Sequence, residues 1–245
     1  RAAAEAAIDR AGFDRGIVLA FFAASPPQTV EGAIALAGAL EQSGNQADAQ
    51  ALIRDWWRNR SFEEASQSRI YSRWGPWLTT DDHDARVSML LSGPHGQATR
   101  AMVDLASPDK AAVANAAIAI RSAYSPDAIV SGLSTQQALD PAVAMERVRT
   151  LRSANRNREA YDLLRYLPPA PSHSDGQNTL WSERRNLFLD ALQDRNWRAA
   201  YDAMNGHGFP GGERKVDAEF FAGWVALTKL NDPATAARHF EALRT

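Results

Sequence analysis

Apolar side chains recur along this 245-residue sequence at spacings of three and four residues, which is the period of an amphipathic α-helix. Between residues 160 and 167, the apolar positions 160, 163, 164 and 167 share one stripe of a predicted helix. From 216 to 230 the apolar arc is broader, which indicates a helix buried on more than one side. Runs of alternating β-branched residues, typical of half-buried strands, are missing. The pattern therefore predicts helix nearly everywhere.

Turn-forming residues interrupt this pattern and leave segments of mostly 10–16 residues. Glycine, proline and small polar residues mark these turns, at 25–27, 43–45, 75–76, 92–94, 107–108, 125–126, 140–141, 168–171, 206–212 and 232–233. Three of the turns place a capping side chain directly before a proline, which is a favoured start of a helix. They predict helices over 109–124, 142–153 and 234–244.

A loose internal repeat accompanies the turns. Short predicted helices carry an alanine and, three positions later, another apolar residue: Ala49/Leu52, Ala98/Ala101, Ala160/Leu163, Ala200/Ala203 and Ala237/Phe240. The alanines are 49, 62, 40 and 37 residues apart, whereas a tetratricopeptide array repeats about every 34 residues. Because alanine lets paired helices approach closely, we predict an all-α fold, an α-superhelix or solenoid of stacked helical hairpins that is tetratricopeptide-like but irregular.

The one long loop that the sequence predicts lies between Leu167 and Asn178 and is rich in proline and serine. We expect this loop to divide the chain into two parts. The first is an N-terminal helical superhelix over residues 1–167, and the second is a C-terminal helical segment over residues 179–245.

Composition and charge narrow the classes of function. Hydrophobic residues make up 45% and charged residues 23% of the chain, as in ordinary globular proteins, so disorder is not expected. A net charge of −2 gives no electrostatic reason to expect nucleic acid or an anionic membrane as a partner. The lack of cysteine excludes disulfides, thiol catalysis and cysteine-bound zinc. The longest apolar run, residues 16–24, is too short to span a bilayer.

Motifs of phosphate binding and of serine hydrolases are missing, since the glycine-rich stretch 206–212 follows a predicted helix and no Gly-x-Ser-x-Gly occurs. The run Asp81-Asp82-His83-Asp84 resembles a cation site only superficially, because consecutive side chains at a helix start radiate outward. We interpret this run as N-terminal helix capping. We predict no metal site and no cofactor site.

The glutamates that general acid–base catalysis would need are also interpreted as structural. Glu5, Glu63 and Glu64 are assigned to polar helix faces, where we expect solvated charge. Glu183 lies beside two arginines, a setting that suits an ion pair between neighbouring helices better than a general acid. We therefore predict no catalytic residue in this chain.

Two groups of residues remain as candidates for contact with a glycan or a protein partner: Trp56, Trp57, Trp74 and Trp77, and Arg149, Arg152 and Arg156. Exposed aromatic rings stack on sugar rings, but tryptophans also bury a large apolar area between helices, and the adjacent Trp56 and Trp57 favour packing. The three arginines would share one face if a single helix extended through all three positions. The interpretation that we favour for them is a solvated face with scattered ion pairs.

Segment 181–240 carries a distinctive series of motifs: Trp181-x-Glu183-Arg184-Arg185, Ala199-Ala-Tyr201, His207-Gly208, residues 217–227, residues 230–234 and His239-Phe240. Upstream, the series continues in residues 77–83 with Arg86 and Leu90-Leu91, and in residues 139–142 with Glu146-Arg147. Together these motifs resemble the superhelical (U/linker) domain of the soluble lytic murein transglycosylase family. The resemblance extends over residues 45–245 and is most specific from 181 to 240.

The resemblance implies a periplasmic protein that acts on peptidoglycan. The family cleaves the β-1,4 bond between N-acetylmuramic acid and N-acetylglucosamine and forms a 1,6-anhydro sugar without metal or nucleotide. Its catalytic domain follows the superhelix and carries a Glu-Ser pair, which occurs nowhere in this chain. We therefore expect a non-enzymatic scaffold that docks its own catalytic domain and guides glycan strands. Because the chain begins at Arg1 rather than methionine and ends without a helix terminator, we expect a trimmed piece of a longer exported protein.

The alternative is a helical-repeat adaptor that binds a protein partner, as solenoids of this kind commonly do. The alanine pattern suits both the scaffold and the adaptor. A binding experiment distinguishes them, because the scaffold is expected to bind cell-wall sacculi and the adaptor a periplasmic protein. An independent enzyme has little support, because no nucleophile, base or metal-ligand set converges in the sequence.

Overall fold

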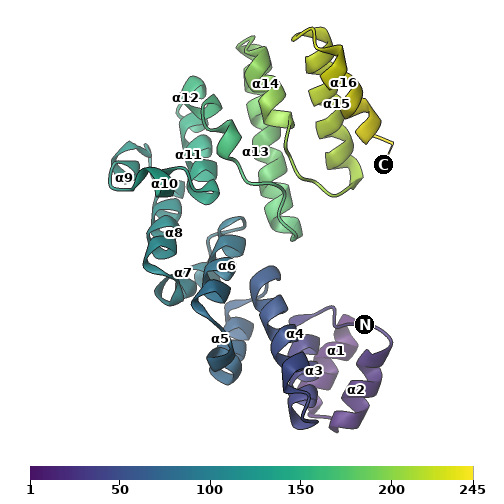
Figure 1. Cartoon of the computed structure of the whole chain (residues 1–245). Coiled ribbons are helices and arrows are strands. Elements are labelled where there is room, and N and C mark those ends of the chain that lie inside the picture. The colour runs from purple at the N-terminus through teal and green to yellow at the C-terminus, as the bar shows by residue number, and fades with distance from the viewer. Residues whose placement is uncertain (245) are drawn as a thin grey trace. The chain divides into compact units, whose positions relative to one another are not determined.

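The chain folds into helices and connecting turns over residues 1–244, which are the residues that this computed structural model describes. No strand occurs among them, and the predicted all-α class is confirmed. The helices form two compact units (Figure 1). Unit 1 comprises Arg1–Leu90 and His95–Ser107, and unit 2 comprises Leu91–Pro94 and the residues from Pro108 onward.

Unit 1 is built around one helix with many small residues. Its helices are α1 (Ala2–Ala11), α2 (Arg15–Ala23), α3 (Val30–Gln42), α4 (Gln46–Asn59), α5 (Glu64–Trp74), η1 (Gly75–Trp77), α6 (Thr80–Leu91), α7 (Gln97–Met102) and η2 (Val103–Leu105). Helix α3 packs against α1, α2 and α4, because its buried glycines and alanines let these neighbours approach closely. A small apolar core joins Ile8, Val18, Phe22 and Ala39.

Unit 2 contains the proline-led helices that the sequence predicts. Its helices are α8 (Pro108–Arg121), α9 (Asp127–Val130), α10 (Thr135–Ala138), α11 (Pro141–Ser153), α12 (Asn157–Tyr161), η3 (Leu164–Tyr166), α13 (Ser174–Gln193), α14 (Trp197–Met204), α15 (Gly212–Thr228) and α16 (Pro233–Ala242). Asp140 caps α11 by accepting the Ala142 N–H, and Asp232 caps α16 by accepting the Thr235 N–H. Helix α8 ends at Arg121 rather than at the predicted residue 124.

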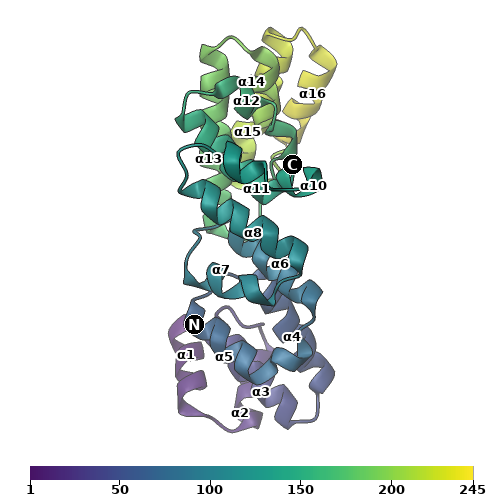
Figure 2. The ribbon, with the colours of Figure 1, turned by 90° about the vertical axis from the view of Figure 1, so that its left-hand side faces the viewer.

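Helices of unit 2 pack in sequence order, α13 against α14, α14 against α15, and α15 against α16. Figure 2 shows α15 and α16 side by side from a second direction. One apolar core runs from Met145 on α11 to Ala236 on α16. The predicted loop is shorter than expected, because α13 already begins at Ser174 and only residues 167–173 connect it to η3. This connection lies within unit 2, and its Ala170 N–H donates to the His207 carbonyl at 2.9 Å. The junction between the compact units lies at 107–108, whereas the sequence-based division into 1–167 and 179–245 falls inside unit 2.

A recurring turn underlies part of the predicted alanine repeat. The backbone is left-handed at Gly44, Asn155 and Arg195, with φ of 81°, 58° and 56°. In each case the next residue donates its N–H to the carbonyl five positions earlier, at 2.8–2.9 Å, which is the Schellman turn that ends a helix. An alanine of the repeat lies five residues after each left-handed residue, and all three alanines are fully buried: Ala49, Ala160 and Ala200.

The predicted repeat needs correction at two positions. Before α16 the left-handed residue is Asn231, with φ of 53°, and the buried alanine five positions later is Ala236, whereas the predicted Ala237 is exposed. Ala98 is only half-buried, and no left-handed residue precedes it in α7 or in its N-cap. The register of the repeat therefore follows the turn, because the left-handed residue fixes where the next helix begins.

Candidate functional site

The four candidate tryptophans lie in unit 1 and are largely buried. Trp56, Trp57 and Trp74 are buried, and the half-buried Trp77 stacks on Trp74 with ring centroids 6.1 Å apart. Burial agrees with the packing interpretation, since a buried ring offers no face to a sugar. Contact of these residues with a glycan stays a prediction, and Trp77 is the one of the four that is not fully buried.

A buried polar cluster surrounds Trp57. His83 of α6 contacts the Trp57 and Tyr71 rings, each at a centroid distance of 5.8 Å. The Arg86 guanidinium lies 4.7 Å from the centroid of Trp57 and donates to the carbonyls of Trp57 and Arg60 at 2.9 and 3.2 Å. Burial lowers the pKa of Arg86 to about 9. This arginine holds the C-terminal end of α4, where helix carbonyls carry partial negative charge.

Arg184 has the corresponding position in unit 2. It donates to the carbonyls of Ala203, Asn205 and Gly206 at 2.8, 3.1 and 3.3 Å, at the end of α14. Burial lowers its pKa to about 10. Arg184 therefore turns away from its sequence neighbour Glu183 and fastens α13 to the end of α14.

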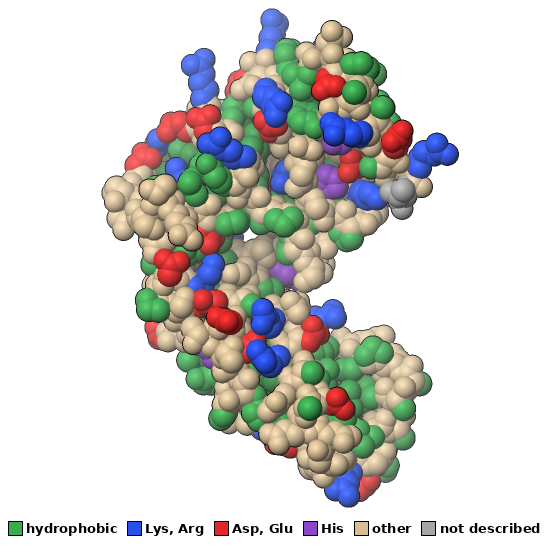
Figure 3. All heavy atoms as spheres, viewed as in Figure 1, with side chains coloured by type: hydrophobic (Ala, Val, Ile, Leu, Met, Phe, Trp, Pro, Cys, Tyr) green, Lys and Arg blue, Asp and Glu red, His purple; other side chains and the backbone are tan. Residues whose placement is uncertain are grey.

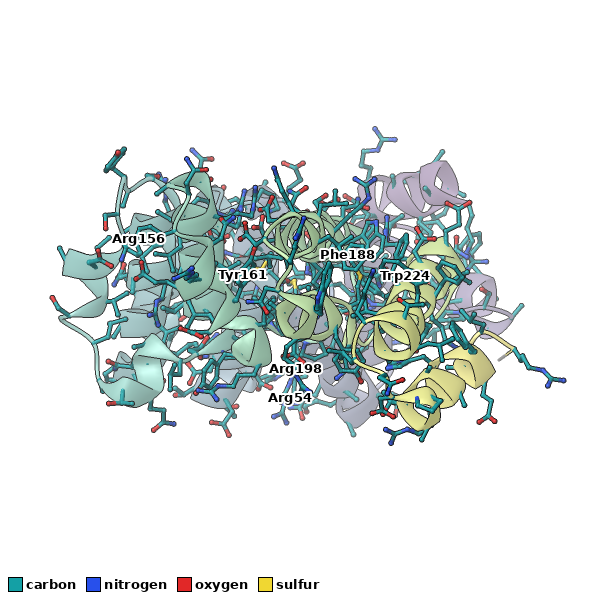
Figure 4. The ribbon with its side chains drawn as sticks, turned by 90° about the horizontal axis from the view of Figure 1, so that it is seen from above. Arg54, Arg156, Tyr161, Phe188, Arg198 and Trp224 are labelled. Atoms are coloured by element: carbon teal, nitrogen blue, oxygen red, sulfur yellow. The ribbon has the colours of Figure 1, made fainter. Side chains whose placement is uncertain are left out.

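Glu183 forms the predicted ion pair between neighbouring helices, with a partner that the sequence did not suggest. It accepts a hydrogen bond from Arg152 of α11 at 2.7 Å. Arg149 reaches Glu146 at 3.5 Å, and Arg156 pairs with acidic residues of α9 and α12. The continuous basic ridge is not formed, because α11 ends at Ser153 and the left-handed turn carries Arg156 away from the helix (Figure 4).

The Asp81–Asp84 run is a helix start, as predicted. Asp82 accepts the Thr79 N–H and hydroxyl at 2.9 Å each, and it also accepts from Arg54 and Arg58. Burial acts to raise the pKa of Asp82, but the hydrogen bonds from Thr79 and Arg54 outweigh it, so the pKa lies below its ordinary value. Asp84 points elsewhere and accepts from Ser107. Over residues 1–244, no group of three or more histidines and carboxylates is arranged to hold a metal ion.

The prediction that Glu5 lies on a solvated face is wrong. Its side chain is 0% exposed and accepts hydrogen bonds from the Thr29 hydroxyl and N–H at 2.8 Å, the Gln28 N–H at 3.0 Å and Arg1 at 2.9 Å. Gly32 makes this possible, because a Cβ there would collide with the Glu5 carboxylate. Burial acts to raise the pKa of Glu5, but these hydrogen bonds lower it below its ordinary value. Glu5 therefore fastens α1 to the start of α3 as a carboxylate.

A chain of four polar side chains joins α14, α15 and α16, and the sequence analysis assigned it no role. The Phe209 N–H donates to His207 Nδ1 at 2.9 Å, so the neutral ring donates from Nε2 to Glu219 at 3.0 Å. Glu219 also accepts from His239 Nδ1 at 2.6 Å, and the Tyr201 hydroxyl lies 3.1 Å from His239 Nε2. Burial lowers the pKa of His207. The sequence could have indicated this polar chain through the two histidines of the His207-Gly208 and His239-Phe240 motifs.

A small pocket in unit 2 brings Arg149 beside an exposed aromatic ring that the sequence analysis did not single out. The cavity has a volume of about 300 Å³ and is lined by the end of α8 and one side of α11. Its rim residue Tyr124 is 93% exposed, and its floor contains Glu146, which accepts two hydrogen bonds from Arg121. The sequence gives one indication of this exposure: Tyr124 directly precedes the Ser125-Pro126 turn, outside the apolar stripe of the preceding helix.

Two other cavities are larger. One, of about 920 Å³, lies in unit 2 at the turns after α11 and α13, where Tyr161 donates to Asp194 at 2.8 Å (Figure 4). The other, of about 570 Å³, lies in unit 1 between α1, α2, α3 and α5. Acidic and basic side chains are intermixed on the face seen in Figure 3 rather than gathered by sign.

Comparison with family models, with curated proteins and with solved structures finds no match for this chain. Among residues 1–244, no helix combines the length and apolar character needed to cross a bilayer.

Proposed function

We propose that this chain is the non-catalytic helical scaffold of a periplasmic peptidoglycan lytic transglycosylase, which docks the catalytic domain of that enzyme and guides the glycan strand. One observation carries the proposal: the residues of segment 181–240 that give the resemblance are used to fasten helices together. Arg184 holds the end of α14, and Glu219 joins His207 to His239. Gly223 leaves room for Phe240, whose ring a Cβ would meet at 2.7 Å. A scaffold needs its distinctive residues at such junctions.

The proposal includes the solenoid arrangement within the chain. Its support is the repeated combination of a left-handed turn residue and a buried alanine five positions later, which recurs at Ala49, Ala160, Ala200 and Ala236. In helical-repeat proteins each unit contacts mainly its neighbours, and small rotations between units create an extended concave surface. Such a surface suits a polymer that is held through many weak contacts.

The carboxylates support the non-catalytic part of the proposal. A general acid in glycan cleavage must hold its proton near neutral pH, which requires a raised pKa. Glu5 and Asp82 have lowered pKa values, because each accepts several hydrogen bonds. Glu146 and Glu183 are bound to arginines. The hydrogen bonds and ion pairs of these four buried side chains favour a structural role over that of a general acid.

Binding to isolated sacculi tests the proposal. The purified chain is incubated with peptidoglycan sacculi and collected by sedimentation, with a helical protein of similar charge as the control. We expect this chain to sediment with the sacculi and the control to stay in solution. Failure to sediment at any tested protein concentration would contradict the proposed function.

An apolar stripe on α15 favours the second candidate, an adaptor for a protein partner. Val216, Phe220 and Leu227 are 49%, 47% and 46% exposed and lie on one side of the helix by their spacing. Exposed apolar clusters of this kind mark protein interaction sites. A Phe220→Asp variant separates the candidates, because an adaptor loses its protein partner from a periplasmic extract, whereas a glycan-binding scaffold still sediments with sacculi.

A further inference from the structure

We propose that the pocket beside Tyr124 is a saccharide-binding subsite that takes one N-acetylhexosamine unit of a β-linked glycan. This inference rests on the proposed function and names the residues that would contact the glycan. The Tyr124 ring is assigned as the stacking platform, and Arg149 is assigned as the hydrogen-bond donor. Neither is a residue that the helix packing of unit 2 requires.

The first argument is the exposure of Tyr124. The tyrosine ring extends into solvent with 93% of its surface exposed, and no ring, cation or hydrogen-bond contact engages it within residues 1–244. Aromatic rings are usually at least partly buried, since they carry a large apolar area. A pyranose ring presents a face of C–H groups that covers an aromatic ring. The candidate tryptophans Trp56, Trp57 and Trp74 lack this property, because their rings are already buried.

The second argument is the supply of hydrogen-bond donors next to the ring. A guanidinium has five N–H donors, and within residues 1–244 Arg149 makes one long hydrogen bond, to Glu146 at 3.5 Å. Arg149 therefore has N–H groups left for ring hydroxyls and for the acetamido carbonyl of an amino sugar. Ser153 adds an exposed hydroxyl on the same side of α11.

The third argument is that the floor of the pocket is held in place. Arg121 donates to both Glu146 oxygens and to the Gly93 carbonyl at 2.9 Å, and Thr150 donates to the Ile120 carbonyl at 3.2 Å. These contacts fix Glu146 beside Arg149. A fixed floor beside a free ring is an arrangement that binds a ligand without first reorganising.

The size of the pocket fits one sugar and not a long oligosaccharide. Its volume of about 300 Å³ is at the lower end of the usual range of ligand pockets, which is about 300–1,000 Å³. Neighbouring sugars would remain in solvent, so the expected affinity is weak, with a Kd in the millimolar range. Weak, single-sugar contact suits guidance of a strand, whereas the larger cavity near Tyr161 has no exposed aromatic ring among its lining residues.

Nuclear magnetic resonance titration of the full chain with a tetrasaccharide of β-1,4-linked N-acetylglucosamine tests the subsite. We expect shift changes centred on the end of α8 and on α11. The Tyr124→Ala variant should weaken binding about threefold to tenfold, the range of one aromatic contact, and Arg149→Ala should weaken it similarly. Tyr124→Phe should retain binding. The matched control is Arg158→Ala, which removes an exposed arginine of the same unit outside the pocket.

The same variants in the sacculus sedimentation assay separate this inference from the proposed function. Both the subsite and the proposed function are supported if the wild type sediments with the sacculi, Tyr124→Ala sediments less, and Arg158→Ala sediments as the wild type does. Wild type and Tyr124→Ala that bind sacculi and the tetrasaccharide equally well overturn the subsite and leave the proposed function standing. Tetrasaccharide binding centred on Tyr124 without sedimentation of the wild type supports the subsite and contradicts the proposed function.

Discussion

Over residues 1–244, each unit buries one arginine and one histidine, and the two units hold the histidine differently. In unit 1, Arg86 and His83 lie against aromatic rings; Arg86 donates to Gln67 and to the carbonyls of Trp57 and Arg60, whereas His83 Nδ1 is buried without a hydrogen-bond partner in the described structure. In unit 2, Arg184 donates to three carbonyls, and both ring nitrogens of His207 are hydrogen-bonded. The two arginines are therefore held alike, each by three hydrogen bonds. The units differ at the histidine, which packs against rings in unit 1 and is hydrogen-bonded at both nitrogens in unit 2.

The two arginines show how an all-helical chain tolerates buried cations. Neither Arg86 nor Arg184 has a carboxylate partner among residues 1–244, yet both lie at the C-terminal end of a helix. The carbonyls there carry about half a negative charge in total and lack partners within their own helix. Each arginine thus satisfies carbonyls that would otherwise be buried and unpaired, while the carbonyls offset part of its desolvation.

Removing the two arginines should give the largest effects. Arg86→Ala leaves Gln67 and the carbonyls of Trp57 and Arg60 without their donor. It also opens space beside the rings of Trp57 and Phe62, whose centroids lie 4.7 and 4.0 Å from the guanidinium, so we expect a loss of about 4–5 kcal/mol. Arg184→Ala should cost about 3 kcal/mol, since it removes hydrogen bonds with no ring contact. Urea unfolding followed by hydrogen exchange measures each loss in its own unit. A loss below about 1 kcal/mol in either variant would show that the carbonyls do not depend on the arginine.

Replacing the histidines should sharpen the contrast. His207→Phe leaves the Phe209 N–H and one Glu219 oxygen without partners, and the expected loss is about 2 kcal/mol. His83→Phe keeps the ring contacts and removes a nitrogen that has no partner, so its expected effect is within about 0.5 kcal/mol of zero. Thermal unfolding of the two variants checks both values. Equal losses would contradict the division between packing and hydrogen bonding.

Acid should weaken both units before the carboxylates titrate. Burial lowers the pKa of His83 and of His207 below the ordinary 6.5. The unfolded chain then takes up the proton first, so stability is present above pH 6.5 and is lost as the pH falls through the folded pKa. Hydrogen exchange at pH 7 and pH 5 should show this loss in both units, and His83→Phe should remove it from unit 1 alone. Unchanged pH dependence in that variant would refute the assignment.

Much of the fold is predictable from local chemistry. Asp140-Pro141 and Asp232-Pro233 begin helices because capping and the fixed proline backbone act within one turn. The alanine repeat is predictable at Ala49 and is displaced at Ala237, because the left-handed residue Asn231 sets the register.

Contacts between distant residues account for what the sequence did not predict. Glu5 is buried because Gly32, on another helix, leaves room for its carboxylate. The partner of Glu183 is Arg152 of α11, and not one of its sequence neighbours. Tyr124 is exposed because it lies beyond the end of α8 at Arg121. The spacing of apolar residues in the sequence does not predict at which residue α8 ends.

The smallest expected effect is at the proposed saccharide subsite. Tyr124→Ala and Arg149→Ala should change the free energy of unfolding by no more than about 0.5 kcal/mol, because both side chains are exposed and make few contacts. Thermal unfolding checks this directly. A clear loss of stability would show that the two residues belong to the packing of unit 2, and would weaken their assignment as ligand contacts.

Chromatography of the soluble products after incubation with sacculi tests the central claim, a glycan-binding scaffold without catalysis. We predict that the chain is recovered with the sacculi and that no 1,6-anhydro-muropeptide appears in the supernatant, since the pKa values of Glu5 and Asp82 are lowered and Glu146 and Glu183 are bound to arginines. Release of 1,6-anhydro products by this chain alone would contradict the account.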